Sequence, residues 1–236
     1  MTDNIYNPDF VKGLFNRMSG SYERVNYITS FGFSIRWRRQ FINRIPATDE
    51  KIEVIDLLTG MGENWESVRR IFPNANISSL DFSEEMIKRA ELKNKKHFNN
   101  RILVLQQDIL QNKLPSNYYD IVICAFGLKT FDHEQLKTLA LETNRILKPG
   151  GKFSFVEVSK PDNFILKFFY GFYLGSIIPI LGRLFQGDPT AYEMLWQYTE
   201  KFVNAKSVTE IFRNVGLTAN YNSYFFGCAS GFSGYK

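Results

Sequence analysis

The sequence is poor in the residues that cross-link a fold or bind metals. Its 236 residues include only two cysteines and two histidines. The cysteines, Cys124 and Cys228, sit among apolar residues and form neither a disulfide framework nor the spaced cysteine pairs of a zinc site. We therefore expect a reduced, cytoplasmic protein that binds no metal.

We also expect no signal peptide, and the sequence contains no long hydrophobic run. The first ten residues, MTDNIYNPDF, lack the basic region and apolar run of a signal peptide. The most apolar segment, residues 164–185, contains only 15 consecutive uncharged residues, 168–182, whereas a membrane-spanning helix needs about 20. We expect this segment to form either a helix pair buried in an insertion, or a lid or apolar substrate channel.

The chain is mildly basic, and its charge is dispersed. Lysine and arginine number 29 against 24 acidic residues, which gives a net charge of +5. Apart from residues 36–39 and 93–96, the basic residues do not cluster as they do in nucleic-acid-binding proteins. We predict no nucleic-acid partner and a mild attraction to an anionic surface or substrate. Peripheral membrane contact and a homodimer both stay open.

From residue 51 onward, short β-type runs alternate with longer stretches of helical periodicity. This alternation predicts an α/β fold with a doubly wound parallel sheet and right-handed crossovers. Residues 148–151 are expected to stop a helix, with a glycine supplying the left-handed cap. The expected strands are 52–58, 76–80, 102–105, 119–126 and 152–158, and the expected helices are 64–71, one that follows an N-cap at Ser83, and 133–147.

The N-terminal region and the apolar segment differ from this alternating core. Residues 7–45 place aromatic and apolar residues at helical spacing. We divide the chain into an N-terminal helical lid at 1–48, a core formed by 49–161 and 204–236, and an apolar helical insertion at 162–203. The length fits one domain with an insertion better than two full domains.

Four segments that follow predicted strands contain glycine, acidic or aromatic residues. They are residues 59–65, 81–86, 108–109 and 125–130. Ligands of open parallel sheets bind at the carboxyl ends of the strands, near the point where the strand order reverses. The sequence therefore predicts one ligand site to which all four segments contribute.

The first of these segments is a glycine turn. Gly60 and Gly62 allow a tight strand-to-helix turn whose N–H groups approach a ligand closely. Trp65 stands where a dinucleotide-binding turn has its third glycine, and no Lys-Ser/Thr pair follows as in a P-loop. A ligand without phosphates is the remaining interpretation.

Two aspartates extend this interpretation to a nucleoside. Asp81 lies 19 residues after Gly62 at the end of the next strand, where an acid accepts hydrogen bonds from ribose hydroxyls. The alternative is that Asp81 assists the cap of the helix that begins near Ser83. Asp108 ends the third strand and either binds an exocyclic amine or only begins a loop.

These residues resemble a class I S-adenosylmethionine-dependent methyltransferase and, more narrowly, the ubiquinone/menaquinone C-methyltransferase family. The resemblance covers roughly residues 12–236. Its motifs are an N-terminal Y-x-x-x-N…S-F-G…W-R-R, then D-F-S-E-E-M, F-G-L-R-N and E-x-S-K-P, and a late P-x-x-G…Y-x-x-L. They correspond to Tyr22, Asn26, Ser30–Gly32 and Trp37–Arg39, then to Asp81–Met86, Phe126–Thr130 and Glu157–Pro161, and finally to Pro179, Gly182, Tyr192 and Leu195.

The resemblance implies a fold, a cofactor and a reaction. It implies a mostly parallel, seven-stranded Rossmann-like sheet with N-terminal helices and a helical insertion after the fifth strand. It also implies S-adenosylmethionine as methyl donor and C-methylation of a quinol or phenol-type acceptor, aromatic or prenylated, as in quinone biosynthesis. Methylation of a specialised metabolite at carbon, oxygen or nitrogen is an alternative, and a non-catalytic binding protein is a second.

The implied site has a cofactor side and an acceptor side. On the acceptor side we name Tyr22, Lys129, His133 and Tyr192. Lys129 could stabilise a phenolate, and His133 is either a base or a surface histidine behind an Asp132 N-cap. The cofactor side comprises Asp56, Thr59, Gly60, Met61, Gly62, Asp81, Phe82, Met86, Asp108, Ile109, Ala125 and Phe126.

The chain departs from the family pattern at three places. Met61 replaces a threonine that usually contacts the cofactor, and Ala125 replaces a small polar residue. Lys129 and Thr130 stand where the family has Arg-Asn, and lysine lacks the planar fork of arginine. We expect a cofactor site that is retained but altered, and an acceptor site that is changed.

Overall fold

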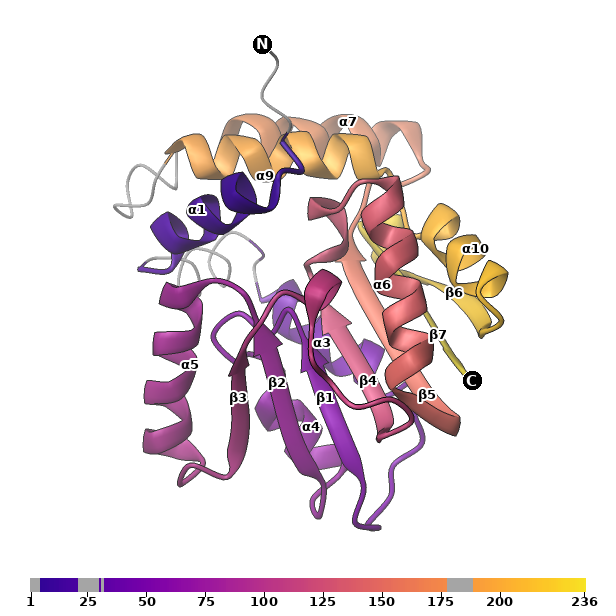
Figure 1. Ribbon diagram of the computed structural model, residues 1–236. Helices are drawn as coiled ribbons and strands as arrows, with labels where there is room; N and C mark the ends of the chain where they lie inside the picture. Colours follow the sequence, from indigo (N-terminus) through magenta and orange to yellow (C-terminus); the bar gives the residue numbers. More distant parts are fainter. Residues whose placement is uncertain (1–4, 21–29, 31, 178–188) are drawn as a thin grey trace.

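The computed structural model of the protein describes residues 5–20, 30, 32–177 and 189–236. Its centre is a seven-stranded sheet in the order β3-β2-β1-β4-β5-β7-β6 (Figure 1). All neighbouring strands are parallel except β7, which is antiparallel to both β5 and β6. This confirms the mostly parallel, seven-stranded sheet. The strands are β1 Glu53–Leu57, β2 Asn76–Asp81, β3 Ile102–Gln106, β4 Tyr119–Ala125, β5 Leu147–Val158, β6 Thr218–Tyr224 and β7 Ala229–Tyr235.

Helices cover both faces of the sheet because the central strands are apolar on both sides. On one face, α3, α4 and α5 pack on residues such as Val54, Ile77 and Ile123. On the other face, α6 and α10 pack on residues such as Ile55 and Phe155. The helices of these two layers are α3 Phe33–Ile42, α4 Trp65–Ile71, α5 Glu84–His97, α6 His133–Ile146 and α10 Lys206–Asn214.

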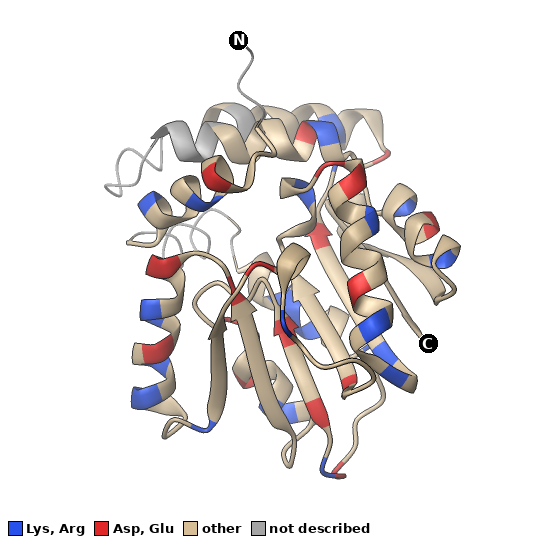
Figure 2. Cartoon of the chain, in the orientation of Figure 1, with Lys and Arg blue, Asp and Glu red and all other residues tan. Residues whose placement is uncertain are grey.

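The charged side chains lie mainly on the outer sides of these layers. Figure 2 shows Lys and Arg distributed over several helices, and α5 carries alternating bands of both signs. The first turn of α5 holds Glu84 and Glu85 and its last turn holds Lys95, Lys96 and His97, which matches the helix dipole. Ser83 caps α5, as predicted, by accepting the Met86 N–H through its hydroxyl at 3.3 Å.

A third group of helices covers the carboxyl ends of the strands. These are α1 Pro8–Met18, α7 Phe164–Phe172 and α9 Pro189–Phe202, with α7 beside α9 (Figure 1). A buried cluster that includes Leu14, Met18 and Tyr198 holds α1 and α9 together, and the Tyr198 hydroxyl donates to the Ile5 carbonyl. We call these three helices the cap.

The N-terminal region is divided between the cap and the sheet face. We predicted that residues 1–48 form one lid, and α1 does lie over the sheet edge. By contrast, α3 is buried on the sheet face, where the Ser154 hydroxyl donates to the Phe41 carbonyl at 2.7 Å. Trp37, Phe41 and Ile42 of α3 belong to the core there.

The turn at residues 148–151 is not the predicted glycine helix cap. Helix α6 ends at Ile146, and Leu147 is already extended and opposite Tyr119 at the start of β5. The register then shifts between Tyr119 and Ile121, and Gly150, with φ of +77°, lies in this irregular part of the strand. The backbones of Gly150 and Gly151 also form hydrogen bonds with the backbone of Lys236, which follows the last strand. Pairing within the sheet therefore ends the helix before the predicted glycine cap.

Helix α7 is not buried as a helix pair in an insertion would be, so that expectation was wrong for this helix. None of its residues is buried, and five apolar side chains on it are exposed. The part of the apolar segment at 178–185 lies outside the described residues. Within the described ranges, no helix is long and apolar enough to cross a membrane.

Candidate functional site

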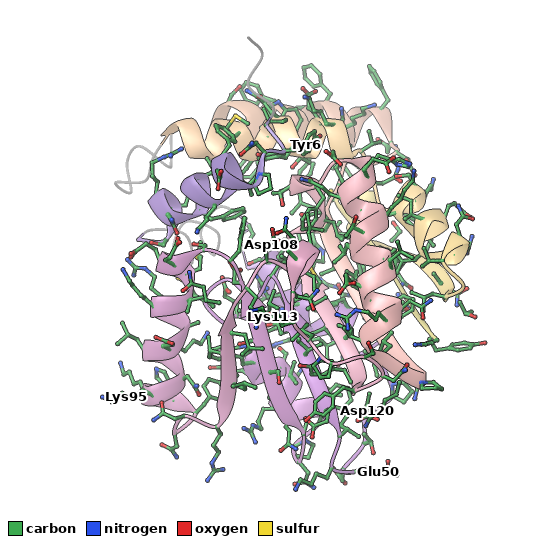
Figure 3. The ribbon with its side chains drawn as sticks, in the orientation of Figure 1. Tyr6, Glu50, Lys95, Asp108, Lys113 and Asp120 are labelled. Carbon is green, nitrogen blue, oxygen red and sulfur yellow. The ribbon has the colours of Figure 1, made fainter. Side chains whose placement is uncertain are left out.

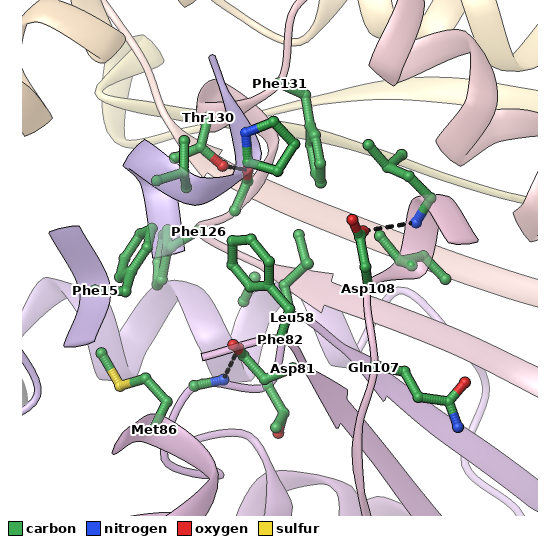
Figure 4. Close-up of a pocket in the computed structure, with 18 of the residues that line it drawn as sticks. Phe15, Leu58, Asp81, Phe82, Met86, Gln107, Asp108, Phe126, Thr130 and Phe131 are labelled. Atoms are coloured by element: carbon green, nitrogen blue, oxygen red, sulfur yellow. Dashed lines mark hydrogen bonds between the residues drawn. The ribbon is translucent and has the colours of Figure 1, made fainter. Parts of the chain in front are cut away.

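A cavity lies where the strands end beneath α1, as the strand-end argument predicted. Its lining comes from the segments that follow β1, β2, β3 and β4, together with residues of α1. Figure 4 shows acidic and aromatic side chains around it. Nine predicted cofactor-side residues line it: Thr59, Gly60, Asp81, Phe82, Met86, Asp108, Ile109, Ala125 and Phe126.

Asp56 lies behind the residues that line the cavity and holds the glycine turn in place through hydrogen bonds. Its carboxylate is fully buried at the end of β1 and accepts the Thr59 hydroxyl at 2.7 Å and the Asn64 side-chain amide at 2.8 Å. The Asn64 side-chain oxygen accepts Arg38 Nη1 at 2.9 Å, and Trp65 Nε1 donates to the Thr59 hydroxyl at 3.1 Å. Burial raises the pKa of the Asp56 carboxyl to about 7.

Trp65 stands at the position of a third glycine, and its side chain packs beneath the turn. Its ring is fully buried directly beneath Gly62, which has a φ of +79°. A Cβ atom at Gly62 would come within 2.5 Å of that ring. Gly62 therefore provides room for the tryptophan, and the ring fills the space below the turn.

Asp81 is held between two turns at the cavity wall. One carboxylate oxygen accepts the Gly60 N–H at 2.8 Å, the bond drawn in Figure 4, and the other accepts the Ser83 N–H at 3.0 Å. Burial raises the pKa of the Asp81 carboxyl to about 6. A carboxylate has about four acceptor positions, so this one can still accept two ligand hydroxyls. Assisting the helix start and binding a ribose are compatible here.

Asp108 begins a loop, which is one of the two roles that the sequence left open. It caps the short 3-10 turn η1, Ile109–Gln111, by accepting the Leu110 N–H at 2.9 Å. At the same time it lines the cavity beside Gln107 and Ile109. Figure 3 places Asp108 on the sheet side of the space between the sheet and the cap, with Tyr6 on the cap side.

Met61 connects the turn to the cap and does not line the cavity. Its side chain is buried in the cluster that contains Leu14, Met86 and Tyr198. Its N–H donates to the Glu63 carboxylate at 3.1 Å. The residue that replaces the family's usual threonine thus packs against α1 and α9.

Arg38 is a cavity residue that our sequence reasoning did not single out. Within the described ranges it is the one lysine or arginine that lines the cavity. Its guanidinium lies 4.7 Å from the centre of the Phe126 ring and 3.9 Å from Glu63. Arg38 belongs to the W-R-R motif, but only tertiary packing shows that it reaches the glycine turn.

Lys129 is engaged in a buried ion pair beside the cavity. Its ammonium lies 2.5 Å from the carboxylate of Glu157, which is fully buried and also accepts the Lys129 backbone N–H at 3.2 Å. The next two residues, Thr130 and Phe131, line the cavity, and Lys129 does not. The sequence contains Glu157 in the E-x-S-K-P motif, but we did not predict this pairing.

Of the other acceptor-side candidates, His133 is the one whose side chain the structure describes, and it does not line the cavity. His133 is the exposed first residue of α6, and Asp132 caps that helix in a capping box with Gln135. It is Gln135 that lines the cavity, and its side chain donates to the Tyr6 carbonyl at 3.0 Å. Tyr22 lies outside the described residues, and Tyr192 lies in α9 with a side chain that is also outside them.

A family model and curated relatives match nearly the whole chain. Residues 3–236 match the ubiE/COQ5 methyltransferase family. A demethylmenaquinone methyltransferase of Porphyromonas gingivalis is 30% identical over 213 residues, which are 89% of this chain and 86% of that protein. A demethylmenaquinone methyltransferase of Geobacillus kaustophilus is 29% identical over 229 residues and 96% of each chain. The family resemblance inferred from the motifs is confirmed.

Solved structures match the fold. An S-adenosylmethionine-dependent methyltransferase from Aquifex aeolicus superposes with a TM-score of 0.59 at 18% identity over 83% of this chain and 88% of that one. The phosphoethanolamine N-methyltransferase 2 of Haemonchus contortus, bound to S-adenosylmethionine, gives 0.57 at 16% identity over 87% of this chain and 46% of that one. At these identities the similarity concerns the fold alone.

Two glycine-to-alanine variants should separate the cost of the steric contact between residue 62 and Trp65 from the cost of backbone strain. We expect Gly150→Ala to cost about 1–2 kcal/mol of unfolding free energy, because it forces alanine into a left-handed conformation. No described residue would lie within 4 Å of the new Cβ there. Gly62→Ala should lose about 1–3 kcal/mol more, because it also meets the ring. Urea unfolding measures both, and equal losses would contradict the packing role of Trp65.

The buried Asp56 carboxyl should make stability depend on pH. Its folded pKa of about 7 lies above the value of 3.8 for an ordinary aspartate. The folded protein therefore holds this proton more tightly than the unfolded chain. The resulting stabilisation is complete below about pH 4 and is lost as pH rises through about 7, a change on the order of 4 kcal/mol.

The test is urea unfolding of the wild type and Asp56→Asn across this pH range. The variant should lose less stability than the wild type as the pH rises, because residue 56 no longer titrates. Asp120→Asn is the control, since Asp120 pairs with Lys148 at the opposite end of the sheet (Figure 3). An unchanged pH dependence in Asp56→Asn would contradict the assignment.

Proposed function

Because the chain belongs to the ubiE/COQ5 methyltransferase family and is an S-adenosylmethionine-dependent methyltransferase, we propose that it methylates a ring carbon of a quinol. The observation that carries this proposal is the family match over residues 3–236. Relatives named demethylmenaquinone methyltransferase support the quinol, because they match over 84–96% of their own length. The donor, when bound, supplies an electrophilic methyl group for in-line transfer.

The cavity residues fit the nucleoside part of the donor. We propose that Asp81 accepts hydrogen bonds from both ribose hydroxyls, and that the Gly60 N–H keeps the carboxylate turned toward them. Asp108 would accept from the exocyclic amine of adenine, between Phe82 and Ile109. Asp56 and Gly62 would act indirectly by shaping the turn, and Met61 by tying it to the cap. Thr59, Met86, Ala125 and Phe126 complete the proposed cofactor side.

Arg38 is suited to hold the carboxylate of the donor's amino-acid part. A guanidinium has five N–H groups, and the described contacts place one of them in a hydrogen bond, to Asn64. Asn64 and the Phe126 ring fix its position before any ligand binds, which favours a charge-assisted hydrogen bond. Arg38 would compensate for the side-chain hydrogen bonds that Met61 and Ala125, unlike the family's usual residues, cannot make to the donor.

The acceptor would lie between the donor and the cap. Phe15, Phe126 and Phe131 line the cavity and can enclose an aromatic ring, and α1 excludes water from the reacting carbon. Tyr22, Lys129, His133 and Tyr192 remain candidates for contact with the acceptor. Because Glu157 neutralises Lys129, this lysine would stabilise a phenolate less than a lone cation and would mainly position Thr130 and Phe131.

A different phenolic metabolite is the second candidate acceptor. Lys129 and Thr130 replace the family's Arg-Asn pair next to the cavity, and Lys129 is already paired with Glu157. These differences favour an acceptor that does not need a bidentate guanidinium at this position. The reaction would remain a methyl transfer, so the non-catalytic alternative is not proposed.

Variants at Arg38 and Asp81 should differ in their affinity for a shortened ligand. S-adenosylhomocysteine contains the amino-acid part, and 5′-methylthioadenosine keeps the ribose and adenine but lacks it. We expect Arg38→Gln to weaken only the first ligand, by about 10–100-fold, whereas Asp81→Asn should weaken both. Calorimetry measures these affinities, with Arg39→Gln, an exposed neighbour, as the control. Equal losses for both ligands in Arg38→Gln would show that Arg38 acts only through the turn.

The acceptor is tested with purified enzyme and a short-chain demethylmenaquinol in reducing buffer. We expect a product that is heavier by one methyl group and whose new methyl signal in NMR lies on a ring carbon. Asp81→Asn, which should impair donor binding, is the matched inactive variant. Binding of S-adenosylhomocysteine without turnover of any quinol would reject the quinol and favour the second acceptor class.

A further inference from the structure

The outer side of α7 exposes a row of large apolar side chains. Phe164 is 81% exposed, and the other four members of the row are between 58% and 66% exposed. Their spacing places them on one side of the helix, and the opposite side packs on the protein through Leu166 and Tyr170. Exposed patches of this kind mark interaction sites. The row consists of Phe164, Ile165, Phe168, Phe169 and Phe172.

A strained turn adds two more aromatic residues next to this row. Phe225 and Phe226 both have left-handed backbone angles, with φ of +43° and +54°, and Phe226 is 78% exposed. Bulky residues avoid this conformation, and strain of this kind clusters at functional sites. The Phe226 side chain is largely exposed to solvent, and its ring lies 5.5 Å from that of Phe225.

The turn lies next to α7, against the side of the helix that packs on the protein. The Tyr170 hydroxyl of α7 donates to the Cys228 carbonyl at 3.3 Å, and the Ser159 hydroxyl donates to the Gly227 carbonyl at 2.7 Å. Gly227 also lies against Pro161, just before α7. We call the five residues of the α7 row together with Phe225 and Phe226 the aromatic face.

The charges at the border of the aromatic face favour an anionic partner. Lys167 is exposed and is the one charged residue of α7. Arg36 is exposed near the turn, 5.9 Å above the Phe33 ring, which in turn lies 4.4 Å from Phe225. Among the described residues, two acids in this region are paired with lysines, Asp162 with Lys206 at 3.9 Å and Glu200 with Lys160 at 3.5 Å.

We propose that the aromatic face docks on the surface of a lipid bilayer that contains anionic lipid. Phenylalanine rings insert at the boundary between headgroups and acyl chains, and basic residues at the rim attract the headgroups. The choice of a bilayer over another apolar partner rests on the proposed function, because a prenylated quinol is dissolved in one. Docking in this way would bring the cap, and the cavity beneath α1, to the membrane surface (Figures 1 and 3).

The test is sedimentation of the full chain with phosphatidylcholine vesicles, with and without phosphatidylglycerol. We expect binding to the anionic vesicles, and about tenfold or greater weakening in a Phe168→Ser, Phe169→Ser double variant. The control is Leu92→Ser, Leu103→Ser, which removes comparably exposed side chains, 68% and 57%, from another part of the surface. Lys167→Gln should weaken binding about fivefold, and only where phosphatidylglycerol is present.

Three results would overturn the docking site. They are no sedimentation of the wild type, equal binding by the aromatic variant, or equal weakening by the control. A dimer in lipid-free sedimentation equilibrium that the aromatic variant converts to a monomer, with vesicle binding unchanged, would assign the face to a second copy instead.

The experiment is independent of the catalytic proposal. The aromatic variant should bind S-adenosylhomocysteine as the wild type does, because none of its changes lies in the cavity lining. If the enzyme methylates no quinol but still sediments through the aromatic face, the docking site stands and the acceptor is wrong. If it methylates soluble quinols but does not sediment, the docking site is wrong and the acceptor stands.

Discussion

The buried Asp56 carboxylate is the contact on which the site depends. It accepts hydrogen bonds from Thr59 and Asn64, so one side chain sets both the start and the end of the glycine turn. Asn64 in turn holds Arg38 at the cavity. Burying a carboxyl is unfavourable unless such bonds compensate, which is why the turn has little freedom to adopt another shape. A turn that is fixed in advance presents its N–H groups to a ligand without a further loss of entropy.

The cap is connected to this turn through apolar packing. Met61 joins the turn to Leu14 and Tyr198, so α1 and α9 rest directly on the ligand site. The cap in turn carries the aromatic face on α7, on its outer side. Within the cap, α1 therefore lines the cavity, and α7 presents phenylalanine to the surroundings. This arrangement suits an enzyme whose acceptor comes from an apolar phase.

Local patterns predicted most of the sheet correctly, because buried strands are short apolar runs between turn signals. The register shift at Gly150 was missed, since it depends on pairing with Tyr119 and on the far end of the chain at Lys236. Nine cofactor-side residues line the cavity because strand ends converge in any parallel sheet. Arg38 and Glu157 were missed, because their roles come from contacts between segments that are distant in sequence.

The fold class, the family and the places where a nucleoside could bind can all be inferred from the residues in order. These follow from periodicity, from glycine and aspartate at strand ends, and from motifs that the chain retains. Three features emerge from packing alone: Glu157 neutralises Lys129, Met61 faces the cap, and the phenylalanines of α7 are exposed. The physical reason is that burial and pairing depend on the partner that packing supplies, and sequence spacing alone does not specify that partner.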